Sequence, residues 1–135
     1  MQVSMARFLL LISFLFFSSG ALPVMAQKSK YAATIEMKKG YISGICILSE
    51  EGDTVRGSFF NEFGISAFDF TYQRSRQKVK LENVIRMLDK WYIKRVLKKD
   101  MVHVLNNLQK GISSYSNDKY HINYQFSLLE DETEK

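Results

Sequence analysis

The chain has 135 residues and a formal net charge of +5. This length allows one domain with a modest core after removal of a leader segment, and it excludes several globular units. The sequence contains one cysteine, Cys46, so an intramolecular disulfide is excluded and packing must stabilise the domain.

Residues 1–26 have the layout of a secretory signal peptide. A basic residue precedes the apolar run at residues 8–17, which is shorter than the roughly 20 residues that a spanning helix needs. The small residues that follow predict cleavage after Ala26, with Ala21 as an alternative. No cysteine follows the apolar run, so the acceptor for lipoprotein acylation is lacking. We therefore expect export to the periplasm or the outer-membrane periphery, with residues 27–135 forming a single β-rich domain.

Strand patterns come first in the exported part. Residues 31–49 are rich in β-branched and aromatic residues around Gly40, which predicts two strands joined by a turn. Residues 54–61 predict a third strand, and the sequence NEFG supplies a turn to a fourth at residues 65–72. Residues 78–85 alternate again, so we expect a meander of antiparallel strands.

The fourth of these strands has one aromatic face. Side chains alternate across a strand, so Phe68, Phe70 and Tyr72 share one side, while Asp69 falls on the mixed other side. Such a face is typical of an ordinary core, because aromatic side chains bury large areas. The alternative, which this pattern favours less, is a site for an apolar ligand.

A change of period then predicts one long amphipathic helix. Apolar residues recur at steps of three and four. They are Ile93, Leu97, Met101, Val104, Leu105 and Leu108. Asp89 is expected to cap the start of the helix, and Gly111 to follow its end.

The outward arc of this helix is basic but not purely polar. It combines Trp91 and Val102 with Arg95, Lys98 and Lys99. A solvated helix face explains these charges, and so does weak contact with an anionic membrane surface.

The last strand pattern lies at residues 120–129, where apolar and polar residues alternate almost perfectly. The sequence ends shortly after it, so we expect either an exposed sheet edge or a truncated reading frame. The predicted fold is therefore α+β, with five or six antiparallel strands and one long amphipathic helix.

Groups suited to catalysis are few. The two histidines, His103 and His121, stand at no metal-ligand spacing with Cys46 or with a carboxylate pair. The sequence has no Gly-rich phosphate loop, no GxSxG and no HExxH. The apolar neighbours of Cys46 predict an unreactive thiol with a raised pKa.

Two carboxylates, Glu62 and Asp69, flank the aromatic run and could act together only if they were close in space. A turn position for Glu62 and a mixed strand face for Asp69 favour solvated or paired groups instead. We expect no enzyme activity, no cofactor, no metal site and no nucleic-acid partner.

The segments GSFFNEFGISAFDFTY, KVKLENVI and LDKWYIKRVLKKDMVHVL together resemble a group of exported Bacteroidota proteins. The architecture of that group is similar to that of the lipoprotein-localisation carriers and receptors, LolA and LolB. The likeness covers about residues 41–108, and its most recognisable parts, NEFGISAFDF and IKRVLKKDM, are packing motifs. It implies a strongly curved sheet, or half-barrel, whose concave side is closed by helices over an apolar cavity for acyl chains.

This resemblance also implies which residues hold the chain. The concave face of the sheet would contribute Phe59, Phe63, Phe68, Phe70 and Tyr72. The helix would act as a lid through Ile93, Leu97, Met101 and Leu105. Members of the superfamily usually have more strands after the helix, so by this resemblance the chain looks short at its C-terminus. The receptors are lipid-anchored and the anchoring cysteine is lacking here, so a soluble carrier is the closer analogue.

The sequence therefore supports two hypotheses about function. The first is a non-enzymatic envelope module that shelters a lipid or a lipoprotein acyl chain, with Trp91, Arg95, Lys98 and Lys99 touching an anionic membrane surface. The alternative is a structural or adaptor protein that pairs with a partner through an exposed strand edge at residues 120–129. The oligomeric state is left open.

Overall fold

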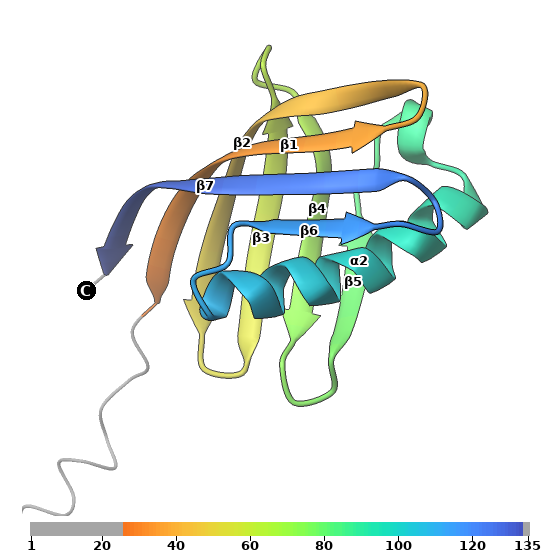
Figure 1. Cartoon of the computed structure of the whole chain (residues 1–135). Coiled ribbons are helices and arrows are strands. Elements are labelled where there is room, and N and C mark those ends of the chain that lie inside the picture. The colour runs from red at the N-terminus through yellow and green to blue at the C-terminus, as the bar shows by residue number, and fades with distance from the viewer. Residues whose placement is uncertain (1–25, 134–135) are drawn as a thin grey trace, which may run out of the picture.

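The computed structural model describes residues 26–133, so the predicted signal peptide lies, apart from Ala26, outside the described residues. Five strands come first and are followed by two helical segments and two further strands (Figure 1). The elements are β1 (Gln27–Met37), β2 (Gly40–Glu51), β3 (Thr54–Asn61), β4 (Ser66–Gln73), β5 (Lys78–Glu82), η1 (Arg86–Leu88), α2 (Trp91–Gln109), β6 (Ser114–Asn117) and β7 (Ile122–Thr133).

The described strands form one antiparallel sheet in the order β5-β4-β3-β2-β1-β7-β6. The sheet curves into a half-barrel, and α2 lies along its open side, where it contacts both edge strands, β5 and β6 (Figure 1). The predicted α+β class, the curved antiparallel sheet and the single long helix are confirmed. The sheet has seven strands in the described residues rather than five or six.

The additional strand, β6, changes the interpretation of the sheet edge. Residues 120–129 were expected to form an edge, but β7 pairs with β1 on one side and with β6 on the other over Ile122 to Gln125. The backbone N–H of Phe126 also donates to the carbonyl of Ser113. The prediction of a free edge is therefore wrong for this half of β7, because the short strand β6 pairs with it.

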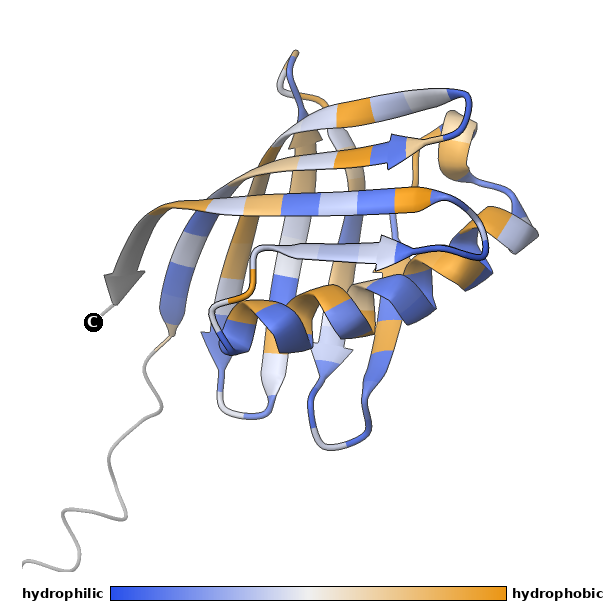
Figure 2. Cartoon of the chain, in the orientation of Figure 1, coloured by the Kyte–Doolittle hydropathy of each residue, from blue (hydrophilic) through white to orange (hydrophobic). Residues whose placement is uncertain are grey.

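The apolar stripe of α2 faces the sheet as predicted. Leu97, Met101, Val104 and Leu105 are buried, and Ile93 and Leu108 are half-buried. Hydropathy mapped onto the ribbon shows the same alternation of apolar and polar residues along the helix and the strands (Figure 2). Val102, which was expected on the outward arc, instead packs half-buried against the core.

The start of the helix differs from the prediction, whereas its end agrees with it. Asp89 does not cap α2: the N-cap is Lys90, without a side-chain hydrogen bond, and Asp89 Oδ1 lies 2.8 Å from Lys94 Nζ. Gly111 follows the helix with a φ of +81°, and its N–H donates to the carbonyl of Leu108. Glycine adopts this conformation without steric penalty, which ends the helix as expected.

Aromatic rings fill the core between the middle strands and the helix. The ring of Phe59 stacks on Phe68 at 5.5 Å between centroids and meets Phe126 edge-on at 6.3 Å. The ring of Phe70 lies over Gly57, where an added Cβ would come within 2.2 Å of its Cζ atom. Tyr72 donates from its hydroxyl to Asn106 Oδ1 at 2.7 Å. This end of the half-barrel is therefore densely packed.

Candidate functional site

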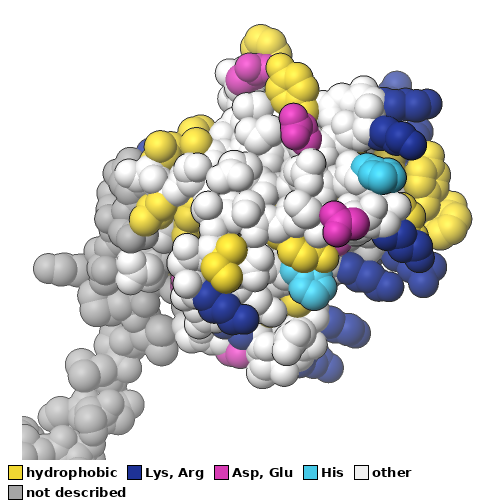
Figure 3. Space-filling view, in the orientation of Figure 1, with side chains coloured by type: hydrophobic (Ala, Val, Ile, Leu, Met, Phe, Trp, Pro, Cys, Tyr) yellow, Lys and Arg dark blue, Asp and Glu magenta, His cyan; other side chains and the backbone are white. Residues whose placement is uncertain are grey.

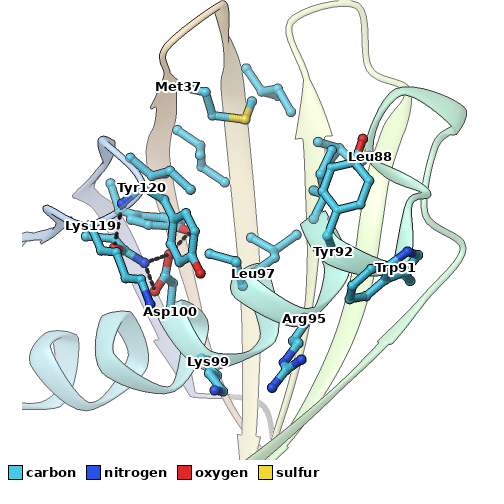
Figure 4. A pocket seen from close by; sticks show the side chains of 17 residues that line it. Met37, Leu88, Trp91, Tyr92, Arg95, Leu97, Lys99, Asp100, Lys119 and Tyr120 are labelled. Atoms are coloured by element: carbon cyan, nitrogen blue, oxygen red, sulfur yellow. Dashed lines mark hydrogen bonds between the residues drawn. The ribbon is translucent and has the colours of Figure 1, made fainter.

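A pocket of about 470 Å³ lies at the other end of the half-barrel, beside the first two turns of α2. Its walls come from the end of the β1–β2 hairpin, from η1 and α2, and from β7 with the turn that precedes it (Figure 4). The volume is within the range of about 300–1,000 Å³ that is typical of small-molecule sites.

The floor of the pocket is apolar. Ile35 of β1 and Ile42 of β2 are register partners, and both are buried. Met37, at the end of β1, continues the same face of the sheet. Leu88 of η1 and Leu97 of α2 close the opposite wall and are 3% and 5% exposed.

Aromatic side chains surround the mouth of the pocket. Trp91 and Tyr92 stand at the start of α2, 72% and 52% exposed, and their rings meet edge-on at 5.7 Å. Tyr120, in the β6–β7 turn, lines the mouth from the facing side (Figure 4). Large aromatic side chains this exposed at the rim of an apolar pocket are typical of a binding surface.

Three basic residues share this mouth. Arg95 and Lys99 lie one helical turn apart on α2, and Lys119 approaches from the β6–β7 turn, its Nζ 5.3 Å from the centroid of the Tyr120 ring. Among the described residues, none of these three cations has a carboxylate oxygen within 4.0 Å. The space-filling view shows hydrophobic side chains at one edge of the molecule, with Lys and Arg side chains around them (Figure 3).

One buried carboxylate, that of Asp100, stands in the wall of the pocket and is 2% exposed. The amide of Asn117 donates to both of its oxygens, at 2.9 and 3.1 Å, and the hydroxyl of Tyr124 donates to Oδ2 at 2.6 Å. These bonds join α2 to β6 and β7 beneath the mouth. The carboxylate is therefore held in place by protein donors.

The same group affects nearby tyrosines. Burial, followed by the hydrogen bond to Asp100, raises the pKa of Tyr124 far above its ordinary value, so its hydroxyl remains a donor at neutral pH. Burial and the charges of Asp100 and Asp118 also raise the pKa of Tyr115, whose ring stacks on His103 at 4.9 Å.

The structure separates the residues that were expected to hold a ligand. Ile93 and Leu97 line the pocket. The other buried ones belong to the packed core and do not line it: Phe59, Phe68, Phe70, Tyr72, Met101 and Leu105. Phe63 is 80% exposed in the β3–β4 turn, away from this group. There the side chain of Asn61 accepts from the N–H groups of Phe63 and Ile65, so the turn directs Phe63 outward.

The residues expected at a membrane surface remain closer together. Trp91, Arg95 and Lys99 all line the mouth of the pocket, while Lys98 is exposed but does not line it. Residues 91, 95 and 99 are spaced one helical turn apart and share a face, and residue 98 lies at the margin of that face, on the side away from residue 99.

Sequence reasoning missed two parts of this site. Asp100 lies three residues after Leu97 and four before Val104, so it falls within the apolar stripe. A carboxylate in that position was the available signal, since buried charges need dedicated partners. Lys119 and Tyr120 had no such signal, because a turn residue reaches the pocket only through the pairing of β6 with β7.

Two other groups that were considered for chemistry, Cys46 and Asp69, do not line this pocket. Cys46 is fully buried, and burial raises the pKa of its thiol, as expected for an unreactive cysteine. Burial raises the pKa of Asp69, but hydrogen bonds from Asn83, Ser58 and Ser66 outweigh it and lower the pKa overall.

Within residues 26–133, no group of three or more His, Cys, Asp or Glu side chains is placed to hold a metal ion. In the same residues, no helix has the length and apolar character needed to cross a membrane. No family model, curated protein sequence or solved structure matches this chain.

Proposed function

We propose that this protein is a non-enzymatic binding module of the cell envelope that holds one acyl chain of a lipid or lipoprotein in the pocket beside α2. The observation on which this proposal rests is the pocket itself: apolar walls from three parts of the fold end at a mouth of aromatic and basic side chains. Apolar walls with few polar groups at one end suit an amphiphile, whose tail enters while its head remains at the mouth.

The proposal moves the ligand from the aromatic run to the opposite end of the half-barrel. Phe59 and Phe68 are fully buried against other rings, so they leave no room for a chain. Ile35 and Ile42 are smaller and lie below a part of the helix that does not fill the space above them. The acyl-chain hypothesis from the sequence is kept, but its location changes.

The same mouth also provides weak contact with an anionic membrane surface. Trp91 is a side chain suited to the boundary between water and lipid, and Arg95 and Lys99 add positive charge beside it. In this proposal the pocket opens toward the membrane from which the chain is taken or to which it is delivered.

Binding of N-phenyl-1-naphthylamine, a neutral probe that fluoresces in apolar surroundings, tests the proposal. Val96 is half-buried and lines the pocket, so Val96→Phe places a ring in the space that a chain would occupy. Val102 is a half-buried valine of the same helix that does not line the pocket, so Val102→Phe is the matched control.

We expect saturable probe binding that an apolar chain displaces. Val96→Phe should weaken the affinity for the probe at least tenfold, which is on the order of the effect of losing one well-placed apolar group. Val102→Phe should weaken it by less than threefold. Mass spectrometry of the purified protein under native conditions should also show a bound lipid. Folded protein that takes up no probe and contains no lipid would overturn the proposal.

A further inference from the structure

The charges at the mouth of the pocket define the head of the ligand as well as its tail. This inference rests on the proposed function, because it concerns the same pocket. We infer that the pocket selects single-chain amphiphiles with an anionic head group, a carboxylate or a phosphate, over neutral ones with the same chain.

The first support is the geometry of the three cations. Arg95 and Lys99, four residues apart on α2, have Cβ atoms roughly 5–6 Å from each other, as neighbours on a helix face do. Lys119 faces them from the β6–β7 turn, across the mouth (Figure 4). A head group at the mouth is therefore approached by positive charge from two elements. A guanidinium and an ammonium both donate to carboxylate and phosphate oxygens.

The second support is that these three cations form no ion pair with a carboxylate of the described residues. By contrast, Lys94 on the neighbouring part of α2 forms an ion pair, with its Nζ 2.8 Å from Asp89 Oδ1. No such pair involves Arg95, Lys99 or Lys119 in the part of the chain that the structure describes.

The third support is the state of the negative charges nearby. Asp100 is the carboxylate that lines the pocket, and it is already bonded to Asn117 and Tyr124. Asp118 is exposed beside Lys119 and does not line the pocket. Three cations and one buried carboxylate therefore face the mouth, so an incoming anion is attracted on balance.

The test compares ligands that share a chain and differ in the head. Dodecanoate and dodecyl phosphate, each below its micelle concentration, and dodecanol, below its solubility limit, compete with N-phenyl-1-naphthylamine for the purified protein. A charge-assisted hydrogen bond typically corresponds to about tenfold or more in affinity, so we expect the two anions to compete at least about tenfold better than dodecanol.

The variants locate the effect. Arg95→Gln with Lys99→Gln should reduce the preference for anions to less than about threefold, by weakening the two anions much more than dodecanol, because the charges that meet the head are removed and the apolar walls are kept. Lys98→Gln with Lys110→Gln removes the same charge from exposed positions of α2 and its C-cap outside the pocket, and it should keep the preference.

Each outcome has a distinct meaning. Equal competition by all three ligands overturns the selection for an anionic head and leaves the acyl-chain pocket standing. Failure of all three to displace the probe overturns the proposed function and this inference with it. A preference for dodecyl phosphate alone identifies a phosphate head, and a preference for dodecanoate alone identifies a carboxylate. An equal loss of preference in both double variants would show net charge rather than the mouth as its cause, and would overturn the inference.

Discussion

The two ends of the half-barrel are covered by the same helix and differ in what lies beneath it. Toward the C-terminal half of α2, Tyr72 of β4 is buried and donates to Asn106, and it belongs to the same packed core as the contacting rings of Phe59, Phe68 and Phe126. Toward its N-terminal half, Ile35 and Ile42 face a pocket. The end with the most aromatic residues is thus the closed one. The number of aromatic residues in a segment therefore indicates a core better than it indicates a ligand site.

The largest expected effect contrasts one residue from each end. Phe59→Ala removes a fully buried ring from between two others, and such changes typically destabilise by about 3–5 kcal/mol. Val96→Ala removes two methyl groups beside a space that is already open, so the expected loss is no more than about 1 kcal/mol. Urea unfolding followed by circular dichroism measures both. Similar losses would show that the two ends are packed alike and would break the comparison.

The next effect concerns how the open end is held together without dense packing. Asp100→Ala leaves the hydroxyl of Tyr124 and the amide of Asn117 without their acceptor, which should destabilise the fold by about 2–4 kcal/mol. Asp100→Asn keeps an acceptor oxygen and should lose less. Denaturant unfolding of the two variants gives the order. A harmless Asp100→Ala would mean that the hydrogen bonds beneath the mouth do not stabilise this end.

The density of the closed end can be tested by adding an atom rather than removing several. Gly57→Ala forces its Cβ into the ring of Phe70, and overpacking of this kind usually destabilises by about 1–3 kcal/mol. Gly40→Ala is the matched control, because nothing lies within 4 Å of its added Cβ, and its effect should stay within about 0.5 kcal/mol. Thermal unfolding separates the two, unless the Phe70 ring has room to move aside, in which case both variants will melt together.

The dependence of stability on pH examines the hydrogen bond between Asp100 and Tyr124. The pKa of Tyr124 is raised in the folded state above its ordinary value of 10.0, so above that pH the unfolded chain loses this proton while the folded chain keeps it. The contribution of Tyr124 is fully present below pH 10.0 and decreases as the pH rises, by about 1 kcal/mol per pH unit. Tyr124→Phe should flatten this alkaline loss in unfolding measurements. An unchanged slope in the variant would assign the loss to other groups.

The parts of the fold that depend on the local spacing of apolar residues were predictable from the sequence. Alternation placed Phe68, Phe70 and Tyr72 on one face of β4, and steps of three and four placed Leu97 and Met101 on the buried side of α2. In each case a residue and its near neighbours in sequence determine which side is apolar. The curvature of the sheet was expected only from the resemblance to LolA and LolB that the sequence suggested, because the spacing of apolar residues does not specify it.

The parts that depend on distant pairing were not predictable in the same way. β6 has the sequence SYSN, with no apolar alternation, and it is a strand because β7 offers it a register from Ile122 to Gln125. The polar start of β1 is likewise a strand through its partners on β2 and β7. The pocket is harder still, because a cavity is the volume that packed side chains leave empty. No single residue of the sequence encodes it.

The smallest effect asks whether the open end faces a membrane. Each charge near an anionic surface contributes on the order of 1 kcal/mol, so replacing Arg95, Lys98 and Lys99 with Gln should weaken association with anionic vesicles, measured by sedimentation. Association of the unmodified protein should decrease with salt, because at an ionic strength of about 0.1 M charges more than about 10 Å apart are largely screened. It should be absent for neutral vesicles, which carry no net charge to attract the cations.

The control for that experiment removes the same charge from the closed end, where Lys78, Lys80 and Lys110 are exposed and distant in the fold from the pocket lining. If the mouth is the contact surface, this second triple variant keeps most of the association, since Trp91 and the cations beside it are intact. Equal weakening by both sets would mean that net charge alone attracts the protein, and that neither end is oriented toward the bilayer. Binding to both vesicle types without salt dependence would instead indicate an apolar contact through the exposed aromatic residues, with no electrostatic part.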